Sequence, residues 1–246
     1  MTGTYLFANI VVRVESLHDN VHRLCHGYET NGQPRLTVRT TREDIDFEHA
    51  RSKAADIAAG RNVVDYNDGY LELLAVYRKI AEAMPVWNTM LVHGSCLAVD
   101  GAAYLFCAPS GTGKSTHARL WRELLGNRVV MVNDDKPLVR VADGTAMVFG
   151  TPWDGKHHLS SNVAVPLRAV CLLGRDESNH IERASLDDAF PSLLGHVYRP
   201  IDPTVLLQTL TLVDRLVGCV DLWRLGCNMD LDAARVSFAA MSGERA

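Results

Sequence analysis

The sequence contains no hydrophobic run long enough to cross a membrane. A membrane-spanning helix needs about 20 consecutive apolar residues, and the longest apolar runs here have the length of β-strands. The N-terminus has no basic leader, and Arg13 and Glu15 interrupt the stretch that a signal peptide would keep apolar. We therefore expect a cytoplasmic protein with no membrane partner and no secretion signal.

An excess of basic charge and closely paired cysteines are also missing. The 25 Lys and Arg residues are balanced by 29 Asp and Glu residues, for a formal net charge of -4. Nucleic-acid binding relies on a positively charged surface, so we expect no nucleic-acid partner. A chain of 246 residues can bury a core without disulfides, and none of its six cysteines forms a C-x-x-C pair. We expect reduced thiols at Cys25, Cys96, Cys107, Cys171, Cys219 and Cys227.

The first third of the chain has the pattern of a small α+β region. Residues 5–14 and 35–40 have the composition of two paired strands, and apolar residues recur at helical spacing over 68–84 before Pro85. No low-complexity linker and no repeat with a period of 20–50 residues is present. We predict an N-terminal α+β region over residues 1–86, of open role, and a larger domain over residues 87–246.

The larger region alternates strands and helices, which predicts an α/β fold with a mixed sheet and flanking helices. The dipeptides Asp100-Gly101 and Asp143-Gly144 each indicate a tight turn between two antiparallel strands. Further strands are expected over residues 128–134 and 167–174, and helices over 114–125 and 203–217. Asp202 is expected to cap the second helix.

The most informative motif is APSGTGKS at residues 108–115, between an apolar strand and an amphipathic helix. Such a loop binds phosphates because its glycines let backbone N–H groups approach the anion at a helix N-terminus. Ala108 departs from the usual first glycine. We expect Lys114 to reach the β- and γ-phosphates and Ser115 to bind Mg²⁺. The residues expected to bind nucleotide are Ser110, Gly111, Thr112, Gly113, Lys114, Ser115 and Thr116.

A pair of acids follows the next predicted strand. Asp134 and Asp135 end the apolar run of residues 129–133, 20 residues beyond Lys114. Phosphoryl-transfer proteins use carboxylates in such positions to hold a metal ion and to orient the nucleophile. The alternative is a solvated turn at the end of a strand.

The stretch HGSCLAVDGAAYLFCAPSGTGKSTHARLW, with VVMVNDD, resembles the catalytic core of HPr kinase/phosphorylase. Its loop SGTGKST also resembles that of ATP-dependent phosphoenolpyruvate carboxykinase. The resemblance covers roughly residues 90–140. It implies a P-loop kinase core of that type in which Asp134 is the base, Asp135 holds metal, and His93 supports the site from a neighbouring strand. The glycine-rich signature that follows the aspartates in that family is not found, which argues against HPr as the acceptor.

A second polar loop, residues 150–158, contains two glycines, a proline, Lys156 and two histidines. It is a candidate acceptor pocket in which Lys156 would neutralise the transferred phosphoryl group, with Trp153 as a flat wall and Arg168 as a further cation. A polar surface turn with a buried tryptophan is the alternative.

Other candidate residues have simpler explanations. His18, His22, Cys25 and His26 lie at helical spacings and could bind zinc, although no fourth ligand segment is evident and a polar helix is the simpler interpretation. Arg199 could contact a phosphate but is more simply a surface residue. We expect Trp121, Trp223 and Met229 to fill the core.

These patterns predict an ATP- and Mg²⁺-dependent kinase that phosphorylates a hydroxyl group of a small molecule, peptide or protein. Two alternatives stay open. The first is an ATP-binding regulator without transfer activity, against which the two aspartates argue. The second is a carboxykinase-like enzyme, for whose substrate lobe the chain is short. Sequence leaves the acceptor and any homo-oligomeric state undefined.

Overall fold

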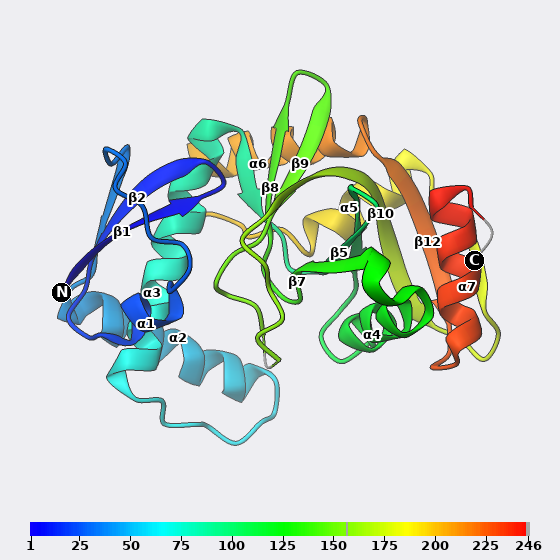
Figure 1. The fold of residues 1–246 in the computed structure, drawn as a ribbon. Helices are drawn as coiled ribbons and strands as arrows, with labels where there is room; N and C mark the ends of the chain where they lie inside the picture. The colour runs from blue at the N-terminus through cyan, green and yellow to red at the C-terminus, as the bar shows by residue number, and fades with distance from the viewer. Residues whose placement is uncertain (156, 245–246) are drawn as a thin grey trace. The chain divides into compact units, whose positions relative to one another are not determined.

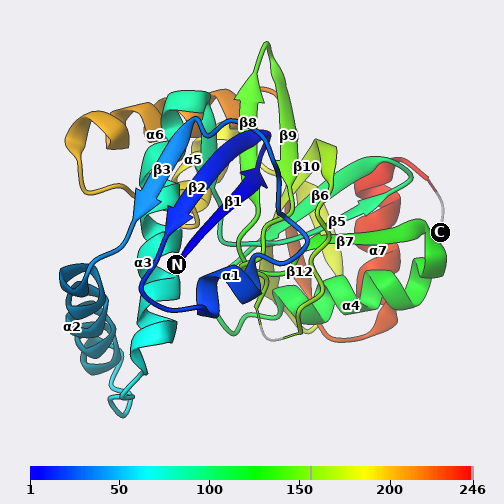
Figure 2. The same ribbon diagram turned by 60° about the vertical axis from the view of Figure 1, so that its left-hand side comes forward.

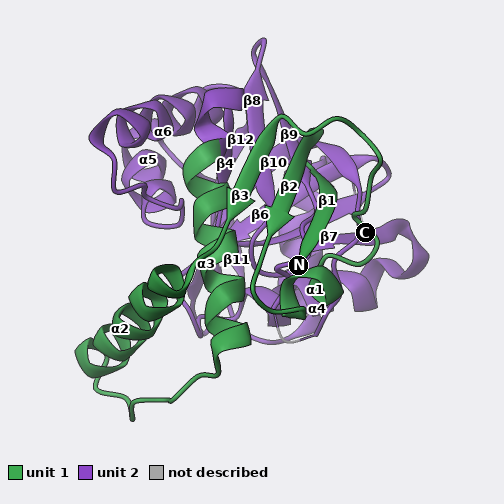
Figure 3. Ribbon diagram, turned by 90° about the vertical axis from the view of Figure 1, so that its left-hand side faces the viewer, with its two compact units in different colours: residues 1–83 green, residues 84–246 purple. Residues whose placement is uncertain are grey.

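The computed structural model describes residues 1–155 and 157–244, and divides into two compact units. Unit 1 comprises Met1–Ala83 and unit 2 comprises Met84–Ala246 (Figure 3). No helix in the described ranges is both long enough and apolar enough to cross a membrane.

Unit 1 contains a three-stranded sheet and three helices. Strands β1 (Thr2–Phe7) and β2 (Ile10–Glu15) pair antiparallel, and β3 (Leu36–Arg39) pairs parallel with β2. The prediction of a single strand over residues 5–14 is wrong, because the chain turns at Ala8 and Asn9, which both adopt a positive φ. The helices are α1 (Asn20–Leu24), α2 (Arg42–Ala58) and α3 (Asp68–Ala83).

The zinc hypothesis takes three ligands from one helix that would carry His18, His22, Cys25 and His26, and this placement is wrong. Helix α1 contains only His22 of the four. The two ring nitrogens of His22 contact Tyr5 Oη at 2.6 Å and Ser16 Oγ at 2.8 Å, and His26 pairs with Glu29. Among the described residues, no group of three or more His, Cys, Asp or Glu side chains could hold a metal ion.

Unit 2 is built on a nine-stranded mixed sheet. Seven of its strands follow the order β4-β8-β9-β10-β6-β5-β7, and the other two branch from it, with β12 beside β10 and β11 beside β12. The strands are β4 (Thr89–Leu91), β5 (Ser95–Val99), β6 (Ala102–Cys107), β7 (Val129–Asn133), β8 (Leu138–Ala142), β9 (Thr145–Phe149), β10 (Ala164–Arg175), β11 (His180–Arg183) and β12 (Asp221–Cys227). The helices are α4 (Lys114–Leu125), α5 (Leu186–Leu194), α6 (Pro203–Val217) and α7 (Leu231–Ser242), with short 3₁₀ helices η1 (Met84–Trp87) and η2 (Gly126–Arg128).

Helices cover both faces of this sheet (Figures 1 and 2). On one face, Leu97 and Phe106 of the central strands pack with Trp121 of α4 and Phe238 of α7. On the other face, side chains such as Leu105 pack with apolar residues of α5 and α6. Successive strand residues point to opposite faces of a sheet, so each central strand contributes to both core layers. The expected α/β class, with a mixed sheet and flanking helices, is confirmed.

Strand β10 joins two parts of the sheet. Its first residues pair antiparallel with β9, whereas the stretch from Leu167 onward pairs parallel with β6 and then with β12. Because β6, β10 and β12 are parallel, their carboxyl ends lie at one edge of the sheet. Loops that follow these three strands therefore meet there, as ligand-binding loops do in open α/β sheets.

Candidate functional site

The APSGTGKS segment occupies this edge of the sheet. It follows β6, which ends at Cys107, and it leads directly into α4, which begins at Lys114. The φ angles of Gly111 and Gly113 are +80° and +128°, a region that residues with a Cβ rarely adopt. Ala108 does not adopt a positive φ, so its side chain is accommodated where the usual motif has glycine. The predicted strand, loop and helix are confirmed as structural elements.

Lys114 lies inside the loop with its ammonium group turned back onto the backbone. Its Nζ donates to the carbonyl of Ala108 at 2.9 Å and to that of Pro109 at 3.4 Å, and the residue is 8% exposed. Burial lowers the pKa of this ammonium, while the negative charges of Asp135 and Asp134 oppose the decrease. A phosphate would add negative charge beside a poorly solvated cation, which strengthens their attraction.

Asn133, at the end of β7, organises the acidic pair that follows it. Its side-chain oxygen accepts hydrogen bonds from the backbone N–H groups of Asp135 at 2.8 Å and Lys136 at 2.6 Å. Its Nδ2 donates to the Thr151 carbonyl at 2.9 Å, and the residue is fully buried. One amide thus fixes the turn after β7 and ties it to the loop of residues 150–161.

The two aspartates have different surroundings. Asp134 is 8% exposed and accepts a hydrogen bond from Ser95 Oγ at 2.6 Å. Asp135 pairs with His93 Nε2 at 3.3 Å and with the ammonium of Lys136. Burial favours the neutral acid at Asp135, but the His93 hydrogen bond and the Lys136 charge outweigh it, so the pKa of Asp135 is lowered. Asp135 is therefore an anion at neutral pH.

His93 lies between β4 and β5, so its expected position on a strand is wrong. Its backbone N–H donates to the His196 carbonyl, and the two imidazole rings meet edge to face with centroids 6.4 Å apart. Burial lowers the pKa of His196, and the positive charges of His93 and Lys114 act in the same direction. His196 follows α5, more than 80 residues beyond the loop, and sequence gave no local signal for its presence here.

A cavity of about 460 Å³ brings most of the predicted site residues together. Its lining includes His93, Lys114, Ser115, Asp134, Asp135 and His157. Ser110, Gly111, Gly113 and Thr116 also line it, whereas Thr112 lines a second cavity on the other side of the loop. The cavity has a cation and a hydroxyl on one wall and two carboxylates on another, which is suited to a polyphosphate with its metal ion.

The second polar loop contributes less than expected. Trp153 is buried and lines none of the three cavities found around the phosphate loop among the described residues. Arg168 lies near the opposite end of β10, where its guanidinium donates to the Ser242 carbonyl, so its assignment to the site is wrong. Lys156 lies outside the described residues.

This loop still brings His157 to the phosphate cavity, and two close contacts hold parts of the loop together. Asp154 is buried and accepts hydrogen bonds from the backbone and hydroxyl of Ser160 and from His158. A Cβ at Gly150 would lie 1.8 Å from the Ser161 carbonyl oxygen, so only glycine allows this close approach of two chain segments.

The second cavity, of about 380 Å³, lies at the carboxyl ends of β10 and β12. Its lining includes Thr112, Leu173, Arg175, Asp176, Asn228 and Met229. The expectation that Met229 fills the core is wrong, since its side chain is 76% exposed, whereas Trp121 and Trp223 are buried as expected. Arg175 donates to the carbonyls of Gly111 and Thr112, which joins this cavity to the phosphate loop.

Comparison with known proteins finds likeness among solved structures, and the likeness described here is weak. No protein-family model matches the sequence, and no curated protein is similar to it. Among solved structures, the chain is similar to the Hpr(Ser) kinase/phosphatase from Coxiella burnetii, with a TM-score of 0.27 and 16% sequence identity. The match covers 52% of this chain and 97% of the other. A likeness of this strength assigns neither a family nor an activity.

Proposed function

We propose that unit 2 binds ATP with Mg²⁺ and transfers the γ-phosphoryl group to a hydroxyl acceptor. The observation that supports this most directly is the single cavity lined by Lys114, Ser115, Asp134 and Asp135. Phosphoryl transfer needs little covalent chemistry from the protein, and depends on positioning and on neutralising the phosphate charge.

In this proposal the phosphates lie along the backbone of residues 110–116, with Lys114 at the β- and γ-phosphates. Ser115, whose side chain is exposed in the cavity, and ionised Asp135 would hold Mg²⁺. Hydroxyl and carboxylate oxygens are the ligands that this cation prefers, so the residues present suit it. The ion would neutralise charge on the phosphate oxygens.

The nucleoside would occupy the second cavity, beyond Thr112. Leu173 and exposed Met229 offer an apolar surface for a base, and the Asp176 carboxylate can accept hydrogen bonds from hydroxyl or amino groups. Asp134, held by Ser95, would receive the proton of the acceptor hydroxyl. His93 would act through Asp135, and we retain Lys156 as a candidate cation for the transferred group.

The test compares Lys114→Ala and Asp134→Asn with the wild-type protein. We expect Lys114→Ala to lose most Mg·ATP binding, measured by calorimetry, because the phosphates lose their buried cation. Asp134→Asn should retain Mg·ATP affinity within a few-fold yet lose at least about 100-fold in turnover, the usual contribution of a general base. Lys53→Ala, a surface change in unit 1, is the matched control.

Two results would contradict the proposal. Unchanged Mg·ATP affinity in Lys114→Ala would remove the loop from nucleotide binding. The second result is that the wild-type protein binds Mg·ATP tightly and consumes ATP no faster than Asp134→Asn. It would favour a nucleotide-binding regulator over a transferase.

A further inference from the structure

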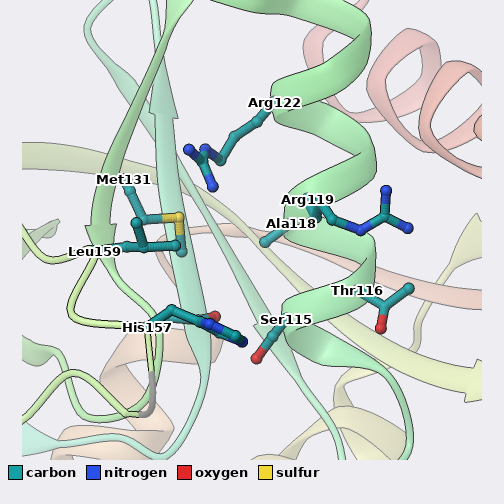
Figure 4. A pocket seen from close by; sticks show the side chains of 9 residues that line it. Ser115, Thr116, Ala118, Arg119, Arg122, Met131, His157 and Leu159 are labelled. Atoms are coloured by element: carbon teal, nitrogen blue, oxygen red, sulfur yellow. The ribbon is translucent and has the colours of Figure 1, made fainter.

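A third cavity, of about 400 Å³, lies on the far side of Ser115 and Asp134 from the phosphate loop glycines. Its lining includes Ser115, Arg122, Met131, Asp134, His157 and Leu159 (Figure 4). It shares Ser115, Thr116, Asp134 and His157 with the phosphate cavity. A molecule bound there would therefore reach the carboxylate to which the proposed function gives the acceptor proton.

Arg122 is the notable side chain of this cavity. Within the described part of the chain, the Arg122 guanidinium has no ion pair with a carboxylate and no hydrogen bond to a carbonyl. Arg119, one turn earlier on α4, also lines the cavity, but its guanidinium pairs with Glu123 at 3.2 Å. In Figure 4 the guanidinium of Arg122 lies on the Met131 side of α4, whereas that of Arg119 lies on the other side of the helix.

The acidic and the basic side chain of this cavity lie apart from each other. Its acid, Asp134, lies at the end that joins the phosphate cavity, and Met131 and Leu159 provide apolar contacts. Arg122 extends from the last turns of α4, away from Ser115 at the first turn. A guanidinium binds carboxylate or phosphate oxygens in two parallel hydrogen bonds. The cavity is thus suited to a molecule with a hydroxyl at one end and an anionic group at the other.

We propose that the acceptor is a small hydroxyl compound with a carboxylate or phosphate group, and that Arg122 binds this group. The inference rests on the proposed function and adds the chemical class of the acceptor. The acceptor oxygen forms a bond to the γ-phosphorus while the bond from that phosphorus to the β–γ bridging oxygen breaks. ADP leaves with the electron pair, and the hydroxyl proton moves to the Asp134 carboxylate.

The test uses three probes of similar size that differ in charge: glycerate, glycerol 3-phosphate and glycerol. With Mg·ATP present, we expect the protein to use at least one anionic probe about tenfold or more better than glycerol, measured as kcat/KM for phosphorylated product. Arg122→Gln should reduce that preference to near unity, mainly through KM, and Arg122→Lys should restore part of it, because Lys keeps the charge but not the paired hydrogen bonds.

Arg215→Gln is the matched control, because Arg215 occupies the last turn of α6 as Arg122 does in α4, but on the other face of the sheet. Each variant removes a positive charge that interacts favourably with a helix C-terminus. If both variants lose the preference for anionic probes, the loss reflects a general effect on folding, and the assignment of Arg122 to the acceptor is overturned. Equal use of charged and neutral probes, no use of any probe, or a preference that survives Arg122→Gln would also overturn it. Mg·ATP affinity, measured on the same samples, separates these results from failure of the proposed function.

Discussion

His117 shows how burial alone fixes the protonation state of a side chain beside the phosphate loop. It lies in the first turn of α4 at 2% exposure, and burial lowers its pKa to about 4. Its Nε2 lies 3.0 Å from Ser237 Oγ of α7 and accepts a hydrogen bond from Trp121 Nε1. The native protein therefore holds a neutral imidazole that joins α4 to α7.

This burial predicts a loss of stability in mild acid. The pKa of His117 is lower in the native state than the unfolded value near 6.5, so the unfolded chain binds the proton more readily. The stabilising contribution is complete above about pH 6.5 and is lost as pH falls toward 4. We expect His117 by itself to lower the free energy of unfolding of unit 2 by about 3 kcal/mol across that range, measured by urea denaturation.

His117→Gln provides the comparison, because glutamine is polar but does not titrate. The difference in unfolding free energy between the wild-type protein and this variant should shrink as the pH falls from 7 to 4.5. A difference that stays constant would show that His117 does not become protonated on unfolding. Asp135 and His196 also have lowered pKa values, but both are present in the two proteins, so their own contributions cancel in this difference.

At the scale of the secondary-structure element, the local sequence predicts a helix or hairpin correctly wherever a turn or cap residue marks its end. Both Asp-Gly hairpins and helix α4 occur as predicted, and Asp202 caps α6 by accepting from Thr204 and Val205 N–H groups. The turn at Ala8 and Asn9 is hard to predict because neither residue is glycine, although both adopt a positive φ. Asn is more tolerant of this conformation than other side chains, so Asn9 was the one available signal.

The candidate site likewise has a part that the sequence predicts and a part that it does not. The phosphate loop and the acids could be predicted because their residues are adjacent in sequence. The hydrogen bond of Ser95 to Asp134, that of Asn133 to Thr151 and the contact of His196 with His93 depend on segments that meet only in the folded sheet. The position of Arg168 cannot be predicted, because sequence does not reveal which end of a strand lies beside the loop.

Contacts between α4 and α7 should decide how firmly the phosphate loop is anchored. Phe238 of α7 is fully buried and packs edge to face on Trp121 of α4, with ring centroids 5.3 Å apart. We expect Phe238→Ala to lower the free energy of unfolding by about 3–5 kcal/mol, the usual cost of removing a buried aromatic ring. Guanidinium denaturation monitored by tryptophan fluorescence would measure it. Phe47→Ala, at an exposed position of α2, should change stability much less, and equal losses would contradict the assignment.

At the scale of the whole molecule, every residue proposed to bind nucleotide lies in unit 2. We therefore expect Mg·ATP to slow amide hydrogen exchange in residues 108–116, 133–136 and 226–230, because these loops line the two cavities. The hairpin of β8 and β9 is an internal control and should not change directly. Protection confined to residues 1–83 would contradict the assignment of the site to unit 2.

The distribution of the thiols gives each unit its own chemical reporter. Cys25 lies in unit 1 and the other five cysteines lie in unit 2, and all are unpaired. Burial raises the pKa of Cys25 and of Cys107 to about 12, and that of Cys227 to about 11. Since the thiolate is the form that reacts with alkylating reagents, these groups are inert until their surroundings open. Alkylation rates at Cys25 and at Cys107 would thus time the opening of the two units separately in a single, unmodified sample.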